Sequence, residues 1–373
     1  MPFRYFVRIR TLTATCKPHG QNPKAKRKNN VTLYLYQCKL LLHPANIRPC
    51  KPPETQHNLI SHPMVSHSSQ KQRWAPTLTL LLLGFVWGSS FILMKWGLFA
   101  SDGSPLFPPL ELAAMRIAIA GIALLPVSLT HWKKLSRPQW LWVSFIGLVG
   151  SFVPAVLFAT AQTELPSAMA GMLNALSPIW TLLIGFALFG LSVKRNQLLG
   201  IGTGFIGTIW LIQAQGSVHT HTSEGVEPIL IPSLLLVIAT VCYGISVNIT
   251  REKLRKLSSP VIASCSLGLA AMPASAIVIN GDIPHLIVSH PDGLQGLIAV
   301  GILGALGTAG ALVLFNQLIA WTSAVTAASV TYIIPIFAAF WGWWDGELLH
   351  AQHLAAGLCI LLGVWLTNRK NKK

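Results

Sequence analysis

The chain has 373 residues, of which 52% are hydrophobic and only 10% are charged, whereas soluble domains carry about 25% charged residues. A mean hydropathy of +0.54 therefore excludes an ordinary soluble protein. The formal net charge is +17, but residues 1–63 hold eleven basic residues and one acid, so nucleic acid would find no soluble basic surface on the rest of the chain. We expect a lipid bilayer, and no nucleic acid, as a partner.

Residues 1–73 form a basic leading segment with no hydrophobic stretch long enough to cross a membrane. Three interpretations stay open for its first part. Translation starts at Met64, because an ordinary short cytoplasmic lead follows that residue; or the segment is an organellar targeting peptide, because it is basic and poor in acids; or it is a disordered tail. Each of the three leaves the membrane prediction unchanged.

Ten apolar segments follow, each near the ~20 residues that cross about 30 Å of hydrocarbon as a helix. We predict helices over residues 76–98, 109–130, 139–159, 166–189, 196–214, 228–248, 260–280, 293–319, 323–344 and 351–368. Several begin at or just after a proline, a position where the missing N–H is not needed by the helix. The predicted fold is an all-α membrane protein with ten transmembrane helices.

The apolar part of the chain is duplicated at an offset of 156 to 157 residues. The matched positions include Trp87-Gly88 with Tyr243-Gly244, Lys95 with Arg251, Leu157-Phe158 with Leu314-Phe315, and Pro178 with Pro335. We assign the first repeat to residues 76–214 and the second to residues 228–368. Because five is an odd number of helices, the two copies are expected in opposite orientations, as a 5+5 inverted repeat. Many transporters use that arrangement to open one central site to either side in turn.

Loop charges predict the topology. Basic residues occupy alternate loops and the ends of the apolar part: Lys71, Arg73, Lys133, Lys134, Arg137, Lys194, Arg195, Arg251, Lys253, Arg255, Lys256, Arg369, Lys370, Lys372 and Lys373. The other loops lack Lys and Arg and hold Asp102, Glu164, Glu224, Glu227, Asp282, Asp292, Asp345 and Glu347. The positive-inside rule then places both termini in the cytoplasm of a multi-pass protein of the plasma or inner membrane.

The cysteines and histidines predict neither a metal site nor a cofactor. The six cysteines form no CxxC pair, and those in the apolar segments read as small packing residues. His350 and His353 are three residues apart and could share a helical face. We interpret them as dispersed loop histidines; an outward metal or pH sensor is the alternative.

Two cations within spans are candidate substrate-binding residues. Lys95 lies about one turn from the outer end of its helix, and Arg116 lies roughly 10 Å into the second span. A cation at the bilayer centre costs about 2.5–3.5 kcal/mol, and less near the interface. Either both side chains reach outward or pair with Asp102 or Glu111, or they bind a carboxylate or a counter-ion.

A second set of candidates consists of aromatic and amide side chains within or at the ends of spans. Its members are Trp87, Gln162, Asn174, Tyr243, Asn316, Gln317 and Tyr332. Asn174 and Tyr332 precede Pro178 and Pro335, prolines that weaken the helix near mid-span and could act in gating. The alternative is interhelical hydrogen bonding for the amides and ordinary packing for the aromatics. The glycines spaced along residues 200–207 and 301–310 favour packing within the chain, with a homodimer face as the alternative.

The sequence resembles the EamA-type permeases of the drug/metabolite transporter superfamily. The residues that carry the resemblance are Trp87-Gly88-Ser89-Ser90-Phe91 with Lys95, Arg116, Ser167-Ala168 with Pro178, Ser323-Ala324 with Pro335, Asp345-Gly346-Glu347, and Gly200, Gly207, Gly357 and Gly363. The resemblance implies a ten-helix inverted-repeat carrier that moves small metabolites, often by export of amino acids or related compounds. The first repeat has Gly190 where the second has Glu347, so the halves have diverged.

Three functions compete. A secondary carrier with a small-molecule substrate is favoured, and no GxxxxGK[ST] motif for ATP is present in the sequence. An intramembrane enzyme would need an HExxH motif, paired mid-span aspartates or a Ser/His pair, and the spans contain none of these. A lipid or polyprenyl-phosphate flippase on the same fold is the alternative; it would need several cations at membrane depth, where only Lys95 and Arg116 qualify.

Overall fold

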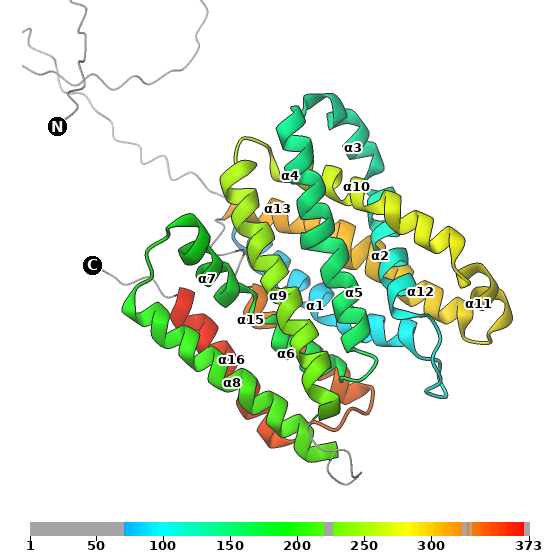
Figure 1. Ribbon diagram of the computed structural model, residues 1–373, viewed down its shortest axis with the longest axis vertical. Coiled ribbons are helices and arrows are strands. Elements are labelled where there is room, and N and C mark those ends of the chain that lie inside the picture. Colours follow the sequence, from blue (N-terminus) through cyan, green and yellow to red (C-terminus); the bar gives the residue numbers. More distant parts are fainter. Residues whose placement is uncertain (1–70, 220–226, 323–326, 328–329, 369–373) are drawn as a thin grey trace, which may run out of the picture. The chain divides into compact units, whose positions relative to one another are not determined.

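The computed structural model describes residues 71–219, 227–322, 327 and 330–368, all within one compact unit, residues 65–373; Figure 1 shows their arrangement. The first-repeat helices are α1 (Lys71–Leu98), α2 (Pro109–Ala123), α3 (Leu125–His131), η1 (Trp132–Lys134), α4 (Arg137–Gly147), η2 (Leu148–Phe152), α5 (Val153–Ala161), α6 (Ser167–Asn174), α7 (Ser177–Phe189) and α8 (Arg195–His219). The second-repeat helices are α9 (Glu227–Lys253), α10 (Ser259–Asn280), α11 (Ile283–Ser289), α12 (Gly293–Gly304), η3 (Ala305–Gly310), α13 (Ala311–Trp321), α15 (Val330–Trp344) and α16 (Ala351–Asn368). Most of the basic leading segment, residues 1–70, lies outside the described residues.

Eight helical stretches in the described part are long and apolar enough to cross a membrane. The second predicted span, residues 109–130, corresponds instead to α2 and α3, which are bent by 57° relative to each other. Pro126, at the start of α3, explains the bend, because a proline removes one helical hydrogen bond and clashes with the preceding turn. The ninth predicted span, residues 323–344, is represented by α15, because most residues before Val330 lie outside the described part.

Equivalent helices of the two repeats pack against each other in antiparallel pairs. In the α8–α16 pair, Gly200 lies against Thr367, whereas Gly207 lies against Ala356 and Ile360, so residue numbers rise along one helix as they fall along the other. The α2–α10 pair shows the same reversal, and so do α6 and α15, which belong to the equivalent predicted spans 166–189 and 323–344. Gly200 and Gly207 of α8 therefore serve close packing within the chain, which small residues favour in membranes. Antiparallel pairing of equivalent helices is what an inverted repeat requires.

Both repeats contain a π-helical turn at the same place. The turn η2 occupies Leu148–Phe152 and η3 occupies Ala305–Gly310, which are equivalent positions at the offset of 157 residues. Each turn approaches a serine on the first helix of the opposite repeat. Gly150 in η2 faces Ser246 on α9, and Gly307 in η3 faces Ser90 on α1. Such turns alter the direction of side chains within a helix and are frequent at functional sites.

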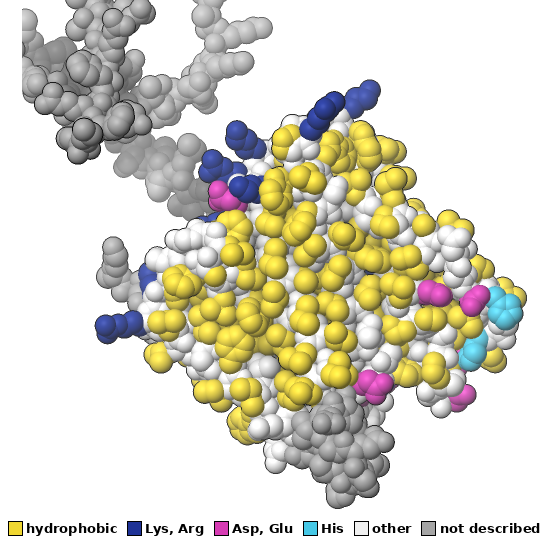
Figure 2. Space-filling model, in the orientation of Figure 1, with side chains coloured by type: hydrophobic (Ala, Val, Ile, Leu, Met, Phe, Trp, Pro, Cys, Tyr) yellow, Lys and Arg dark blue, Asp and Glu magenta, His cyan; other side chains and the backbone are white. Residues whose placement is uncertain are grey.

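Charged side chains separate on the surface as the loop pattern predicts. Figure 2 shows Lys and Arg along the top and left edges of the drawn face, with one acidic side chain among them, and the other acidic side chains and His at the right and lower edges, the right-hand ones near α11 and α12. Between them the drawn face is mostly hydrophobic. Exposed large apolar residues on this unit include Leu198, Leu199, Ile206 and Ile209 on α8. An apolar belt between two polar rims fits a bilayer.

Candidate functional site

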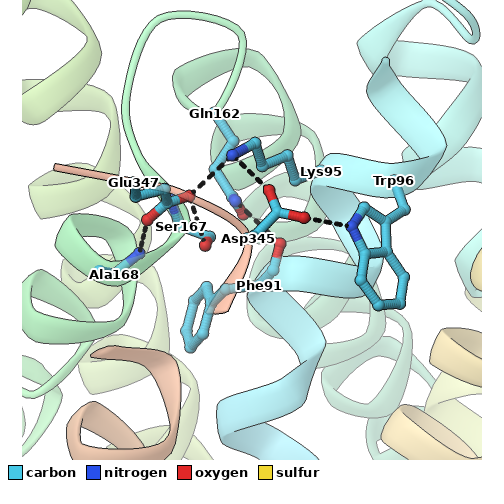
Figure 3. Close-up of polar contacts among 8 residues, drawn as sticks. All are labelled: Phe91, Lys95, Trp96, Gln162, Ser167, Ala168, Asp345 and Glu347. Carbon is cyan, nitrogen blue, oxygen red and sulfur yellow. Dashed lines mark hydrogen bonds and ion pairs between the residues drawn. The ribbon is translucent and has the colours of Figure 1, made fainter. Parts of the chain in front are cut away.

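Lys95, at the C-terminal end of α1, forms ion pairs with two carboxylates of the second repeat. Its Nζ lies 2.6 Å from Asp345 Oδ2 and 3.1 Å from Glu347 Oε1. The other oxygen of Asp345 accepts a hydrogen bond from Trp96 Nε1 at 2.8 Å. Figure 3 shows the ammonium group between the two carboxylates. We call these residues, together with Ser167, the Lys95 cluster; it joins the two repeats and neutralises the lysine.

Glu347 also binds the N-terminus of α6. Its Oε1 accepts hydrogen bonds from the Ser167 backbone N–H at 2.8 Å and hydroxyl at 2.7 Å, and its Oε2 accepts from the Ala168 N–H at 3.0 Å. These contacts satisfy two of the N–H groups that the first turn of a helix leaves unpaired, and a negative charge is favourable there. The carboxylate is only 4% exposed, so its charge is stabilised by the cation and the helix end together.

Gly346 explains why two neighbouring acids reach one lysine. Its φ is +82°, a backbone conformation that side-chain-bearing residues rarely adopt. The chain therefore turns sharply between Asp345 and Glu347, and Figure 3 shows their carboxylates on either side of Lys95. The positions equivalent to the two acids in the first repeat are Leu188 and Gly190, so the second copy of this interaction cannot form.

A cavity of about 490 Å³ lies beside this cluster, lined by Lys95, Trp96, Phe99, Ala100, Ser101, Gly103, Asp292, Gln295 and Asp345. At its rim, Asp292 Oδ2 accepts hydrogen bonds from the Ser101 hydroxyl at 2.7 Å and from the Ser101 N–H at 2.8 Å. The Ser101 hydroxyl, followed by its amide, lowers the pKa of Asp292 below the ordinary aspartate value. The Ser104 hydroxyl lowers the pKa of Asp102 in the same way. This rim therefore stays acidic at neutral pH.

Trp87 on α1 and Arg116 on α2 both contact the π turn η3, and Tyr243 on α9 interacts with Arg116; we call these three residues the central group. Trp87 Nε1 donates to the carbonyl oxygen of Gly307 at 3.1 Å, and Arg116 Nε donates to the hydroxyl of Thr308 at 3.0 Å. Arg116 is also close enough to Tyr243 for electrostatic interaction. All three side chains are partly accessible. The structure therefore brings together three residues that the sequence named separately.

The aromatic contacts of this group repeat across the two halves. The ring centres of Trp87 and Phe315 are 5.3 Å apart, and the Tyr243 ring stacks on the Phe158 ring with 6.2 Å between their centres. Trp87 is equivalent to Tyr243 and Phe158 is equivalent to Phe315, so the two contacts are copies of each other. Two similar aromatic pairs thus lie on elements from both repeats, an arrangement suited to enclosing an organic solute.

Asn174 lies at a break between two helices. The helix α6 ends at Asn174 and α7 begins at Ser177, one residue before Pro178. The Ser177 hydroxyl donates to the Asn174 carbonyl oxygen at 2.8 Å, which satisfies a backbone group that the break leaves without a helical partner. The Asn174 side chain is half-buried and makes no hydrogen bond within the described part of the chain. Pro335, which is equivalent to Pro178 in the second repeat, lies inside the helix α15 and does not interrupt it.

The remaining predicted residues do not join the central group. Gln162 is 2% exposed and donates from Nε2 to the Phe91 carbonyl at 3.0 Å, while its Oε1 has no partner among the described residues. Tyr332 was expected near mid-span, but its hydroxyl accepts from Asn368, the last residue of α16, at 2.9 Å, which puts it near a helix end. Gln317 is exposed on α13, and the side chain of Asn316 lies outside the described part.

Among the residues that the structure describes, no group of three or more His, Cys, Asp and Glu side chains could hold a metal ion. The rings of His350 and His353 are 5.7 Å apart. The Nδ1 of His353 accepts from the His350 backbone N–H at 3.1 Å, and the side chain is buried. That nitrogen is therefore already occupied by the helix start.

The sequence did not identify the partners of the predicted residues. Lys95 was expected to pair with Asp102 or Glu111 if it paired at all, whereas it pairs with Asp345 and Glu347. The three residues were already part of one family resemblance, but nothing in a single sequence indicates that they meet. Thr308 and Gly307 were also missed. Their signal lay in the repeat, because Ser151 and Gly150 occupy the equivalent positions in η2.

Comparison with known proteins places these observations among membrane transporters. The model of the EamA-like transporter family matches residues 74–213 and again residues 230–369. The chain is 28% identical to the uncharacterized inner membrane transporter YedA of Escherichia coli K12, over 77% of this chain and 89% of that protein. It is 24% identical to the S-adenosylmethionine/S-adenosylhomocysteine transporter of Chlamydia trachomatis serovar L2, over 76% and 84%. It is 25% identical to a protein of Salmonella typhimurium LT2 named "probable amino-acid metabolite efflux pump", over 77% and 92%.

Proposed function

Because the chain belongs to the EamA-like transporter family and is therefore a multi-pass membrane transporter, we propose that it is a secondary carrier for small metabolites of the amino-acid type or related compounds. It works by alternating access and in the direction of export. The observation that carries the proposal is the central group, where Trp87 and Arg116 bind η3 of the other repeat and paired aromatic contacts of Trp87 and Tyr243 come from both repeats.

The architecture that we propose is ten spans in two inverted domains, residues 76–214 and 228–368, with a disordered extension before them. The antiparallel packing of α2 with α10, α6 with α15, and α8 with α16 supports it. In such a fold the substrate site lies between the repeats near the membrane midplane, often beside a broken helix. The position of Asn174 at the α6–α7 break and the contacts of Trp87 and Arg116 with η3 of the other repeat support such a site.

The substrate class rests on chemistry and on similarity together. Aromatic rings, one guanidinium and one amide suit a small organic solute with apolar and polar parts. Relatives are named as a transporter of S-adenosylmethionine and S-adenosylhomocysteine and as an amino-acid metabolite efflux pump. Within this chain we assign substrate contact to Trp87, Arg116, Asn174 and Tyr243. Lys95, bound by two acids, we now assign to holding the repeats together.

A lipid or polyprenyl-phosphate flippase is the alternative on this fold. It would need several unpaired cations at membrane depth to hold a phosphate. Of the two intramembrane cations, Lys95 is neutralised by Asp345 and Glu347, which leaves Arg116. Because Arg116 is then the one of these two cations that is free to bind a solute, a solute with a single negative group is favoured.

We also propose a plasma or inner membrane location with both termini in the cytoplasm. The support is the separation of Lys and Arg from most of the Asp, Glu and His side chains on the face drawn in Figure 2, and the relative from Escherichia coli is named as an inner membrane transporter. Labelling of tags at the two ends, with and without membrane permeabilisation, tests the orientation. Ends on different sides would contradict the ten-span count.

The experiment that tests the function is a comparison of metabolites inside and outside cells that lack or overproduce the protein. We expect at least one amino-acid-like compound to accumulate inside the deletion strain and outside the overproducing strain. Overproduction of Asn174→Ala, at the same membrane abundance as the unmodified protein, should no longer cause this compound to accumulate outside the cells. If no metabolite moves in opposite directions in the two strains, the exporter proposal is wrong.

A further inference from the structure

Arg116 is a positive charge without an anionic partner among the described residues. Its Nε donates to the Thr308 hydroxyl, which itself donates to the Leu303 carbonyl and is thereby fixed in direction. No carboxylate of the described part lies within ion-pairing distance of its guanidinium; the ion pairs found there belong to Lys95. The two Nη groups remain available, and the side chain is partly accessible although its neighbours from Leu112 to Met115 are buried.

An unpaired guanidinium within a membrane span is costly unless something neutralises it. The contrast with Lys95 is informative, because that cation has two carboxylates within 3.1 Å. Arg116 instead has a hydroxyl that orients it and a phenol, Tyr243, close by. Neither group carries a negative charge at neutral pH. A solute with an anionic group would supply the missing partner each time it enters.

We infer that Arg116 is the receptor for a carboxylate of the transported solute, and that the apolar part of the solute lies against Trp87 and Tyr243. This inference rests on the proposed function and narrows its substrates to small organic carboxylates with an apolar body. With Nε held by Thr308, the two Nη groups can bind the two oxygens of one carboxylate. Thr308 is a positioning residue in this arrangement, because it fixes the plane of the guanidinium without touching the solute.

The charge balance favours a carboxylate over a phosphate. One guanidinium neutralises a carboxylate completely, but it leaves a phosphate monoester, with a charge of about −1.5 to −2 at pH 7, with a net negative charge inside the membrane. The second intramembrane cation cannot assist, since Asp345 and Glu347 already neutralise it. A dianionic solute would therefore enter this site poorly.

The test uses the purified full chain and four probes that share one apolar body: L-phenylalanine, L-phenylalaninamide, 3-phenylpropionate and 2-phenylethyl phosphate. Binding is measured by the shift of the thermal unfolding midpoint in detergent, and transport by flux in proteoliposomes. The variants are Arg116→Gln, Arg116→Lys and Thr308→Val. Arg251→Gln is the matched control, because it removes an exposed cation at the far end of α9.

We expect the wild-type protein to bind the two carboxylates about tenfold or more tightly than the amide, the ratio that corresponds to one charge-assisted hydrogen bond. Arg116→Gln should reduce this ratio to about one while the protein stays folded, and Arg116→Lys should restore part of it. Thr308→Val should lower the ratio without abolishing it. Arg251→Gln should retain the full ratio.

Several results would overturn the inference. They are equal binding of acid and amide by the wild type, an unchanged ratio in Arg116→Gln, tighter binding of the phosphate, or no binding of either carboxylate. These results leave the proposed carrier function standing if the metabolite comparison still identifies an exported compound without a carboxylate. Conversely, carboxylate binding that depends on Arg116, without any change in cellular metabolites, would contradict the exporter function and support the site.

Discussion

The indole Nε1 of Trp87 donates a hydrogen bond to the backbone carbonyl oxygen of Gly307 at 3.1 Å, and so connects the first helix of one repeat to the π turn of the other. A π turn leaves backbone groups poorly placed for helical bonding, so a side-chain donor stabilises it. Tyr243 holds the equivalent position in α9 but makes no such hydrogen bond among the described residues. The aromatic contacts of Trp87 and Tyr243 therefore repeat in the two halves, but of these two residues only Trp87 adds a hydrogen bond across the repeats within the described part.

Replacing Trp87 by Phe should reduce transport while preserving the fold. The variant keeps a ring against Phe315 but loses the bond to Gly307, at a cost of about 0.5–1.5 kcal/mol. We expect flux to fall several-fold at unchanged membrane abundance, and Trp87→Ala to reduce it further. Trp132→Phe, at an exposed site on η1, is the control and should transport normally. Full flux in Trp87→Ala would remove this residue from the site.

Asn174→Ala should reduce flux with little effect on stability. The amide makes no hydrogen bond within the described part of the chain, so folding loses few contacts when it is removed. We expect a change in unfolding free energy within about 0.5 kcal/mol, measured by thermal unfolding beside the flux assay. Asn280→Ala, which removes an exposed amide at the end of α10, is the matched control. Equal flux in both variants would show that Asn174 does not contact the solute.

Lys95→Met should destabilise the protein more than any neutral exposed substitution. The change leaves Asp345 and the nearly buried Glu347 close together without their cation. Removal of one partner from a buried pair costs about 3–5 kcal/mol, and the partial exposure of Lys95 and Asp345 reduces our expectation to about 1–3 kcal/mol. The thermal unfolding midpoint in detergent measures it.

Restoring charge balance provides the control for this prediction. Glu347→Gln combined with Lys95→Met removes one charge of each sign and should recover part of the lost stability, because the remaining carboxylate no longer faces a second one. Lys95→Arg should remain close to the wild type. If the double variant is no more stable than Lys95→Met, repulsion between the acids is not the cause of the loss.

The contact between Asp292 and Ser101 should depend on pH. The pKa of Asp292 is lowered from its ordinary value of 3.8 by the Ser101 hydroxyl and amide. The contact therefore stabilises the loop fully above pH 3.8 and is lost as the pH falls through the lowered pKa. Hydrogen exchange at the Ser101 amide, corrected for its intrinsic rate, should accelerate there. Asp292→Asn should abolish this dependence, and constant protection in the unmodified protein at low pH would contradict it.

Much of the helical architecture could be predicted from the sequence, because apolar length and loop charge are local properties. The bend between α2 and α3 was missed, although Pro126 gave the signal for it. A proline within a predicted span was a good guide at Pro178, which directly follows the α6–α7 break, and a poor one at Pro335, which α15 accommodates without interruption. In a packed bundle, neighbouring helices decide whether a proline ends a helix or only weakens it.

The sequence predicted which residues belong to the candidate site, but not which of them contact each other. Trp87, Arg116 and Tyr243 were named because hydrocarbon penalises polar groups, and that reasoning says nothing about which of them meet. Trp87 and Arg116 meet through η3, and a π turn has no reliable signature in one sequence. Lys95 shows the same limit: its position at a helix end was evident, but its partners lie 250 and 252 residues further along the chain.

The shared position of η2 and η3 bears on the origin of the protein. An irregular turn that recurs at equivalent residues in both copies is most simply explained by inheritance from one ancestral unit that already contained it. The two copies have nevertheless diverged, because the acids that bind Lys95 in the second half correspond to Leu188 and Gly190 in the first.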